Sequence, residues 1–255
     1  MDLIPFSKPY SPPGAFQIIK KVLSSGFLQG DGPFSKNIEN YISNFYSEYS
    51  VFLMPSCTAA LEMALMLLDI KKGDEVIIPS FTFTSVAAVL TKFGGTPVFC
   101  DINSKNGCIA EEEIESLISE NTRAISWVNY AGLSPNVNNL TRISEKFEIP
   151  LIEDAAHNFR IFPAGLEKLT GDLVTFSFHA TKNIQCGEGG ALLVRREYED
   201  RAFIMRDKGT NRREFLNGNS AKYQWIDKGG SYVLSELNAA LLQSQIANFD
   251  DIQQK

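Results

Sequence analysis

From residue 50 onward, short apolar and β-branched runs alternate with longer segments in which apolar side chains recur every three or four positions. This alternation is typical of βαβ units and a largely parallel sheet. No long helical segment separates the last three runs, which indicates an antiparallel strand near the end of the sheet. The predicted strands span 51–54, 75–79, 97–101, 124–128, 150–154, 173–178 and 191–195. The predicted helices between the first five strands span 58–68, 85–93, 111–119 and 140–147.

The two ends of the chain follow other patterns. Residues 1–49 hold several prolines, a glycine-rich turn and two helical segments at 15–24 and 35–46, so we interpret them as an arm packed on the main domain. Residues 50–235 are the predicted main domain. Residues 236–255 begin as one amphipathic helix without a capping glycine or closing strand, which predicts a chain that is cut short.

Composition excludes several classes of protein. The 255 residues are 44% hydrophobic, enough for a large core, and the net charge of -6 disfavours nonspecific nucleic-acid binding. The N-terminus has no apolar signal segment and no apolar stretch reaches 18 residues, so we expect a soluble, cytoplasmic protein with no membrane partner. The four cysteines lack metal-binding spacing, which predicts small buried side chains and no metal site.

One local exception to the acidic balance is a basic cluster around residues 209–211. It contains Arg206, Lys208, Arg212 and Arg213. Such a cluster can bind the phosphates of a small anionic substrate. A solvated basic surface is the alternative, and the sequence does not favour either.

Lys182 follows a predicted strand in the run Ser-Phe-His-Ala-Thr-Lys-Asn, and a glycine-rich segment, 187–190, comes directly after it. The acidic pair Glu153 and Asp154 ends the preceding predicted strand. A lysine amine can hold an aldehyde cofactor as a Schiff base, and a carboxylate at a strand end can keep a pyridine ring protonated. The pair therefore predicts a pyridoxal phosphate (PLP) site, although Asp154 alone could equally be a helix cap.

Further candidates lie at the ends of other predicted strands. The turn at Cys57 and Thr58 begins a helix and can bind a phosphate through free N–H groups, or Ser56 and Thr58 can simply cap that helix. Ser177 could add a hydroxyl group to the same phosphate. Phe83 is the preferred aromatic residue for stacking on a pyridine ring. Phe81 is the competing residue, and core packing is the alternative for both.

The two histidines, His157 and His179, flank the proposed cofactor residues, and either could contact the cofactor. A Ser-His-Asp hydrolase is disfavoured because no Gly-x-Ser-x-Gly segment is present. A P-loop and a dinucleotide fingerprint are also missing from the sequence.

Together these residues resemble the DegT/DnrJ/EryC1/StrS family of PLP-dependent sugar aminotransferases. The resemblance runs through segments 4–6, 55–62, 73–77, 153–156 and 182–190. Segments 208–212 and 222–225 are most similar to the branch that aminates dTDP-4-dehydro-6-deoxy-glucose at C4. The resemblance implies an α/β fold, the large domain of the aspartate-aminotransferase type with a mostly parallel sheet flanked by helices, and a C-terminal small domain that is missing here.

The resemblance also implies roles for individual residues. Lys182 would be the Schiff-base lysine, Asp154 would contact the pyridine nitrogen, and Phe83 would stack on the ring. Cys57, Thr58 and Ser177 would surround the phosphate. His157 stands where most members have glutamine, near the cofactor's phenolic oxygen, and its titration could move the pH profile. Ser231, where many members have asparagine, lies in a segment expected to reach the cofactor of a second subunit.

The activity implied is transfer of an amino group from glutamate to a nucleotide-linked keto sugar by a homodimer, as in the amino-sugar biosynthesis that supplies lipopolysaccharide O-antigen. The active site would lie at the subunit interface, with Lys182 as the base. A PLP-dependent sugar dehydratase is an alternative, but related dehydratases carry histidine at the position of Lys182. A PLP-binding protein without catalytic activity is the second alternative.

Overall fold

The computed structural model of the chain describes residues 8–159 and 169–254. Segment 4–6, which contributes to the family resemblance, lies outside these residues, as do residues 1–7 of the predicted arm. Within them, no helix is long and apolar enough to cross a membrane.

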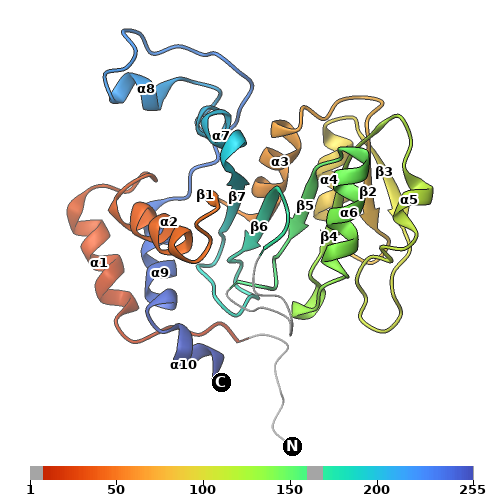
Figure 1. Ribbon diagram of the computed structural model, residues 1–255. Coiled ribbons are helices and arrows are strands. Elements are labelled where there is room, and N and C mark those ends of the chain that lie inside the picture. The colour runs from red at the N-terminus through yellow and green to blue at the C-terminus, as the bar shows by residue number, and fades with distance from the viewer. Residues whose placement is uncertain (1–7, 160–168, 255) are drawn as a thin grey trace, which may run out of the picture.

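A seven-stranded sheet forms the centre of the molecule, in the order β1-β7-β6-β5-β4-β2-β3 (Figure 1). Strands β2 to β6 pair in parallel, and β7 is antiparallel to both of its neighbours. This confirms the mostly parallel sheet and the antiparallel strand near its end. The strands are β1 Tyr49–Met54, β2 Glu75–Pro79, β3 Thr96–Cys100, β4 Thr122–Val128, β5 Leu151–Asp154, β6 Leu173–Ser177 and β7 Gly190–Arg195.

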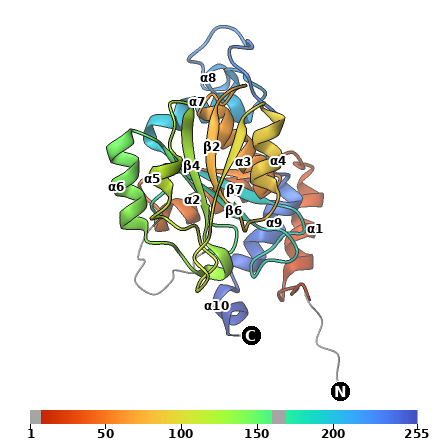
Figure 2. The same cartoon turned by 90° about the vertical axis from the view of Figure 1, so that its right-hand side faces the viewer.

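Helices cover both faces of the sheet, because most strands are apolar on both sides. One face packs against α3 Cys57–Leu67, α4 Ser85–Lys92 and α7 Glu199–Arg206. The other face packs against α2 Pro33–Phe45, α9 Glu236–Ile246 and α10 Phe249–Gln253 on one side, and α5 Ile114–Leu117 and α6 Val137–Phe147 on the other. Figure 2 shows α4 and α6 on opposite sides of β2 and β4.

Some predicted helices differ from the observed ones. The segment predicted as a helix over 111–119 forms only α5, because Glu111 lies in a turn and accepts the Asn136 N–H at 3.1 Å. The prediction of a single C-terminal helix is wrong as well, because α9 ends at Ile246 and α10 follows after a break at 247–248. Helices α7 and α8 (Arg212–Leu216) were not predicted.

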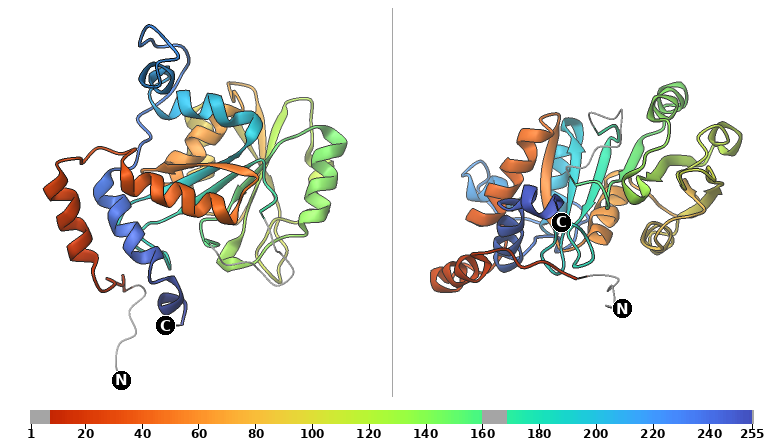
Figure 3. Two further views of the ribbon diagram at one scale, coloured as in Figure 1. Left: turned by 60° about the vertical axis from the view of Figure 1, so that its left-hand side comes forward. Right: turned by 90° about the horizontal axis from the view of Figure 1, so that it is seen from below.

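The N-terminal helices pack on the C-terminal one, although some 200 residues separate them. Helix α1 (Ala15–Ser25) and α2 both contact α9, as Figure 3 shows. Glu236, the first residue of α9, is buried and accepts the N–H groups of Phe34 and Ser35 at 2.9 Å each. A carboxylate there satisfies N–H groups in the first turn of α2 and interacts favourably with the helix dipole. This contact joins the two ends of the chain beside the sheet.

Candidate active site

The carboxyl ends of β5 and β6 bring the predicted acid into a layer of polar side chains. In β6, Thr175 and Ser177 are two residues apart and therefore lie on the same face. Asp154 is the register partner of Thr175, and Ser177 is the partner of Gly190 on β7. Leu173 of the same β6 face and Ile152 of β5 belong to the core beneath α3, so this polar layer lies at the edge of that core.

Asp154 is buried at the end of β5 and has few polar contacts. Its Oδ1 accepts the Ala156 N–H at 3.0 Å, and the Cys57 thiol lies 3.9 Å from the same oxygen. Burial raises the pKa of Asp154 to about 6, against the lowering effect of the Ala156 hydrogen bond and the Lys182 charge. The carboxylate is therefore ionised for the most part at pH 7, but its charge is poorly compensated.

Cys57 contributes its thiol to the surroundings of Asp154. The Sγ atom lies 3.5 Å from Thr175 Oγ1, and burial raises the pKa of the thiol well above its usual value. Cys57 is thus a neutral side chain packed between the acid and a strand hydroxyl. The other three cysteines, Cys100, Cys108 and Cys186, are buried, and all four are free thiols, which confirms the prediction of small buried side chains for those three.

Lys182 lies in the segment between β6 and β7, which folds back on itself through backbone hydrogen bonds. Phe178 donates to Gly189 and Ala180 donates to Gly187, each at 2.8 Å. Burial lowers the pKa of the Lys182 amine, and the Asp154 carboxylate opposes that change. The amine is therefore deprotonated more easily than that of a solvated lysine, as a proton acceptor requires.

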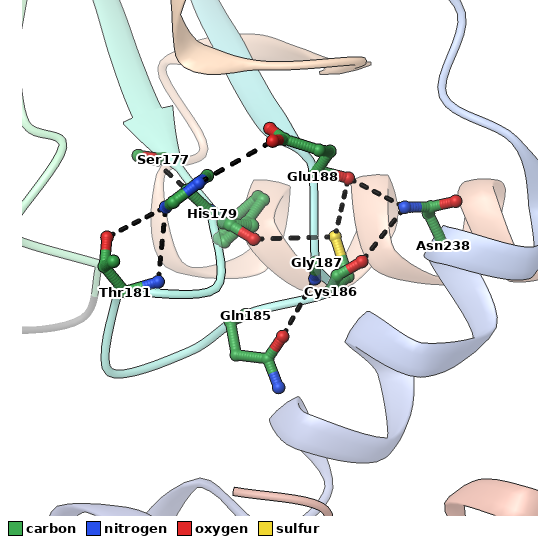
Figure 4. A network of polar contacts seen from close by, with 9 residues as sticks. Ser177, His179, Thr181, Gln185, Cys186, Gly187, Glu188 and Asn238 are labelled. Carbon is green, nitrogen blue, oxygen red and sulfur yellow. Dashed lines mark hydrogen bonds and ion pairs between the residues drawn. The ribbon is translucent and has the colours of Figure 1, made fainter. Parts of the chain in front are cut away.

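Polar side chains also hold this segment in place (Figure 4). Asn238 of α9 donates its amide to the carbonyl oxygens of Cys186 at 3.0 Å and Glu188 at 2.8 Å. The His179 ring contacts the Thr181 hydroxyl at 2.9 Å and lies 3.6 Å from the Glu188 carboxylate. His179 therefore stabilises the segment that carries Lys182.

The first turn of α3 lies beside the same layer. Ser56 caps the helix by accepting the Ala59 N–H at 3.1 Å, which confirms the capping alternative for Ser56. Within the described residues, this leaves the N–H groups of Cys57 and Thr58 without a protein acceptor. The Thr58 hydroxyl lies 2.9 Å from that of Ser85 on α4. The helix end thus offers N–H and hydroxyl donors that suit an anion.

An aromatic group lies on the β2 and β4 side of the site. Phe81 packs on Tyr130 with the ring centroids 4.7 Å apart, and Tyr130 packs edge-on against His157 with the centroids 5.6 Å apart. Phe83 is 76% exposed, and among the residues that the structure describes it joins no such ring stack. Of the two phenylalanines, Phe83 therefore has the free ring face that a planar ligand could cover.

Two further predicted groups lie at the end of α7 and in the segment after it. Ser231, which is expected to reach the cofactor of a second subunit, is exposed and forms a backbone bridge with Asp207. The phosphate-binding interpretation of the basic cluster is wrong for Arg206, which is only 5% exposed and pairs with Asp31 at 2.6 Å and Glu39 at 2.7 Å. Those acidic partners come from the N-terminal helical region, which the local sequence could not reveal.

The remaining cations of that cluster also have partners in the protein. Lys208 and Arg212 both pair with Asp207, and Arg213 lies 3.7 Å from the centre of the Phe203 ring. The cluster is therefore a set of intramolecular contacts that shapes the segment after α7.

Glu153, the other half of the acidic pair, points to the opposite face of the sheet. Its carboxylate is buried and accepts the Asn129 amide at 2.8 Å and the N–H groups of Thr170 and Gly171 at 2.8 and 3.0 Å. Adjacent residues of a strand face opposite sides, so only one of the pair can reach the site. Asp154 is that residue, and Glu153 ties β5 to the backbone before β6.

Sequence reasoning missed Thr175, Ser85 and Asn238. A signal for Thr175 was present, because Thr175 and Ser177 are separated by two positions in an otherwise apolar strand. No comparable signal marked Asn238, whose two carbonyl partners lie some 50 residues earlier in the chain.

These residues fit the groups of PLP. The buried, poorly compensated carboxylate of Asp154 suits a protonated ring nitrogen, and Lys182 supplies an amine for the aldehyde. The donors at the start of α3 suit the phosphate, and Phe83 offers a ring face. The fold and this constellation define the large domain of a PLP-dependent enzyme of the aspartate-aminotransferase type.

The chain belongs to the DegT/DnrJ/EryC1/StrS aminotransferase family, whose pattern it matches over residues 14–255. This confirms the family resemblance and, with it, the expectations of an aminotransferase and of PLP as cofactor. Similar solved structures agree in fold, and the chain spans about two thirds of their length.

Three of these structures illustrate the likeness. Spr1654, a proposed sugar aminotransferase of Streptococcus pneumoniae, has been solved in PMP and PLP forms; the PLP form is 27% identical, with a TM-score of 0.84 over 97% of this chain and 67% of its own. PseC of Helicobacter pylori, an aminotransferase involved in pseudoaminic acid biosynthesis, is 26% identical, with a TM-score of 0.84 over 98% of this chain and 67% of its own. AtS13 of Actinomadura melliaura is 28% identical, with a TM-score of 0.86 over 98% of this chain and 69% of its own.

Proposed function

We propose that the protein transfers the amino group of glutamate to a nucleotide-linked keto sugar, in the biosynthesis of amino sugars. The observation that carries this proposal is the pair formed by Lys182 and Asp154. The pKa of the Lys182 amine is lowered, the pKa of the buried Asp154 carboxylate is raised, and the charges of the two groups interact. Family membership and the similarity to Spr1654, a proposed sugar aminotransferase, support the substrate class.

PLP, when bound, supplies an aldehyde carbon that accepts an amino group and a ring that withdraws electrons from it. Asp154 keeps a negative charge at the end of β5, where it would hold a proton on the ring nitrogen. Lys182 is the base that would move a proton at the substrate carbon, because burial favours its neutral form. The first turn of α3 and Ser177 would orient the phosphate, and Phe83 would cover one face of the ring.

The proposed sugar is dTDP-4-dehydro-6-deoxy-glucose, aminated at C4. Its support is the sequence of segments 208–212 and 222–225, which are similar to that branch of the family. These segments flank α8 and project from the sheet in Figure 1. A dTDP sugar should therefore be the first acceptor tested.

The proposed assembly is a homodimer in which the segment that ends at Ser231 reaches the active site of the second subunit. Exposed apolar side chains on this segment support an interface, with Trp225 77% exposed. The others are Phe215, Leu216, Tyr223 and Ile226. Several large apolar side chains exposed on one segment are typical of a surface that contacts another protein, which supports the proposed interface.

The test is an absorption spectrum of the purified protein with added PLP, recorded before and after glutamate. We expect a cofactor band that is lost in Lys182→Ala, is kept in the control Lys105→Ala, and disappears when glutamate is added. Borohydride reduction and peptide mapping should then locate the label on Lys182. Lys105 is an exposed lysine in the loop after β3, so its variant controls for reaction of PLP with surface amines.

Either of two results would contradict the proposal. A band that does not need Lys182 would show that the cofactor site is wrong. A Lys182-dependent band that ignores glutamate would instead indicate a PLP-binding protein without aminotransferase activity. If both tests succeed, formation of an amino sugar from dTDP-4-dehydro-6-deoxy-glucose, followed by mass spectrometry, decides the acceptor.

A further inference from the structure

His157 differs from an ordinary surface histidine in what its ring nitrogens contact. Its Nδ1 accepts the backbone N–H of Ala131 at 3.1 Å. A nitrogen that accepts an N–H group cannot carry a proton itself, so the single proton of a neutral ring must lie on Nε2.

The backbone that provides this N–H is in an unusual conformation. Ala131 has φ 51° and ψ 27°, in the left-handed region that a residue with a side chain seldom adopts, and Gly132 follows with φ 83°. Together they turn the chain after β4 so that an N–H group faces the His157 ring. Such unfavourable backbone geometry persists only where surrounding contacts hold it.

The charges around the ring also oppose its protonation. Burial lowers the pKa of His157, and the positive charge of Lys182 adds to that effect. Tyr130 packs edge-on against the ring from the segment after β4. Within the described residues no carboxylate pairs with His157, whereas His179 has Glu188 3.6 Å from its Nε2.

We infer that Ala131 is a positioning residue that holds His157 as a neutral imidazole protonated on Nε2, so that His157 serves the site as a hydrogen-bond donor and not as a base. The group that it would serve is an oxygen acceptor on the cofactor, and this part rests on the proposed function. The consequence for the reaction is that Lys182 is left as the base. The pH dependence of kcat/KM should then show no inflection from the titration of His157, which an imidazole free to bind a proton would add.

Nuclear magnetic resonance of the cofactor-free protein tests the inference without any enzymatic activity. Long-range ¹H–¹⁵N spectra of protein labelled at histidine resolve the two ring nitrogens, and the chain has only two histidines. The variant His179→Asn removes the other set of signals and assigns those of His157. We expect Nε2 to be protonated and Nδ1 to be bare, with a titration midpoint below the value of about 6.5 for a free histidine side chain.

Two substitutions at Ala131 separate the backbone contact from general burial. Ala131→Gly keeps the N–H group and favours positive φ, so the His157 signals and titration should not change. Ala131→Val adds a β-branched side chain that resists positive φ, so Nδ1 should lose its partner and the midpoint should rise toward 6.5. A proton on Nδ1 in the unmodified protein would overturn the inference, and so would a folded Val variant with unchanged titration. Should the Val variant not fold, the tautomer of the unmodified protein decides alone.

Cofactor binding gives a second measurement. His157→Gln retains an N–H donor and should bind PLP within about threefold of the unmodified protein. His157→Leu, which has no donor, should bind about tenfold more weakly, as expected for one lost hydrogen bond. Equal weakening in both variants would contradict a donor role. Failure of the proposed function would differ from both, because no Lys182-dependent cofactor band would then form in any variant.

Discussion

The buried charge of Asp154 should lower the stability of the cofactor-free protein although the reaction requires it. Asp154→Asn replaces the carboxylate by a neutral group of the same shape, which retains an oxygen to accept the Ala156 N–H. The substitution should remove the site's ability to hold a proton on the ring nitrogen and so abolish transamination. At the same time it should stabilise the cofactor-free protein at neutral and alkaline pH.

The magnitude follows from the pKa of Asp154, which burial raises from 3.8 to about 6. A carboxyl group with a raised pKa binds its proton more tightly in the folded state, so stability falls as the pH rises from about 3.8 through about 6. At 1.36 kcal/mol for each pKa unit, the full cost above pH 7 is about 3 kcal/mol. Asparagine has no such cost at any pH.

Urea unfolding of the cofactor-free protein measures this difference. Asp154→Asn should be more stable than the unmodified protein by about 3 kcal/mol at pH 8 and by about half of that at pH 5. Asp101→Asn, at an exposed position after β3, is the matched control and should show little difference at either pH. A variant that is less stable at pH 8, or equally stabilised at both pH values, would refute the argument that the buried charge is poorly compensated.

Two further substitutions test the packing that supports the site. Gly190→Ala would place a Cβ atom 2.5 Å from the backbone nitrogen of Cys57, so β7 and the first turn of α3 would have to separate. We expect the free energy of unfolding in urea to fall by about 1–3 kcal/mol and PLP to bind more weakly. PLP binding as strong as in the unmodified protein would contradict this packing. Glu236→Ala would leave the N–H groups of Phe34 and Ser35 without their acceptor. It should cost about 2–4 kcal/mol in urea unfolding, with Glu236→Gln less harmful, and a loss below about 1 kcal/mol would show that water replaces the carboxylate.

Much of the sheet and the chemical centre of the site could be predicted from the sequence. Strand positions follow from short apolar runs, which are a local property of the chain. Asp154 was recognisable because it ends such a run, at the carboxyl edge of a parallel sheet where ligands bind, and Lys182 because it follows the next run and precedes a glycine-rich segment. The role of Ser56 as a helix cap was likewise open to local reasoning.

The errors concern contacts between distant parts of the chain. In the sequence Arg206 resembles a residue free to bind phosphate. In the structure its guanidinium pairs with Asp31 and Glu39, which lie about 170 residues earlier in the chain. The sequence does not predict the left-handed backbone conformation of Ala131, because that conformation depends on the turn whose N–H group contacts His157.

The sequence by itself determined the class of fold, the order of its elements and the kinds of chemical groups available, because hydrophobic periodicity and residue type act locally. Only the tertiary structure decided which of those groups meet. It buried Asp154 and raised its pKa, left Phe83 exposed, turned Glu153 away and gave His157 its donor. These properties depend on desolvation and on neighbours that folding brings together from far apart in the chain, and local patterns contain no record of them.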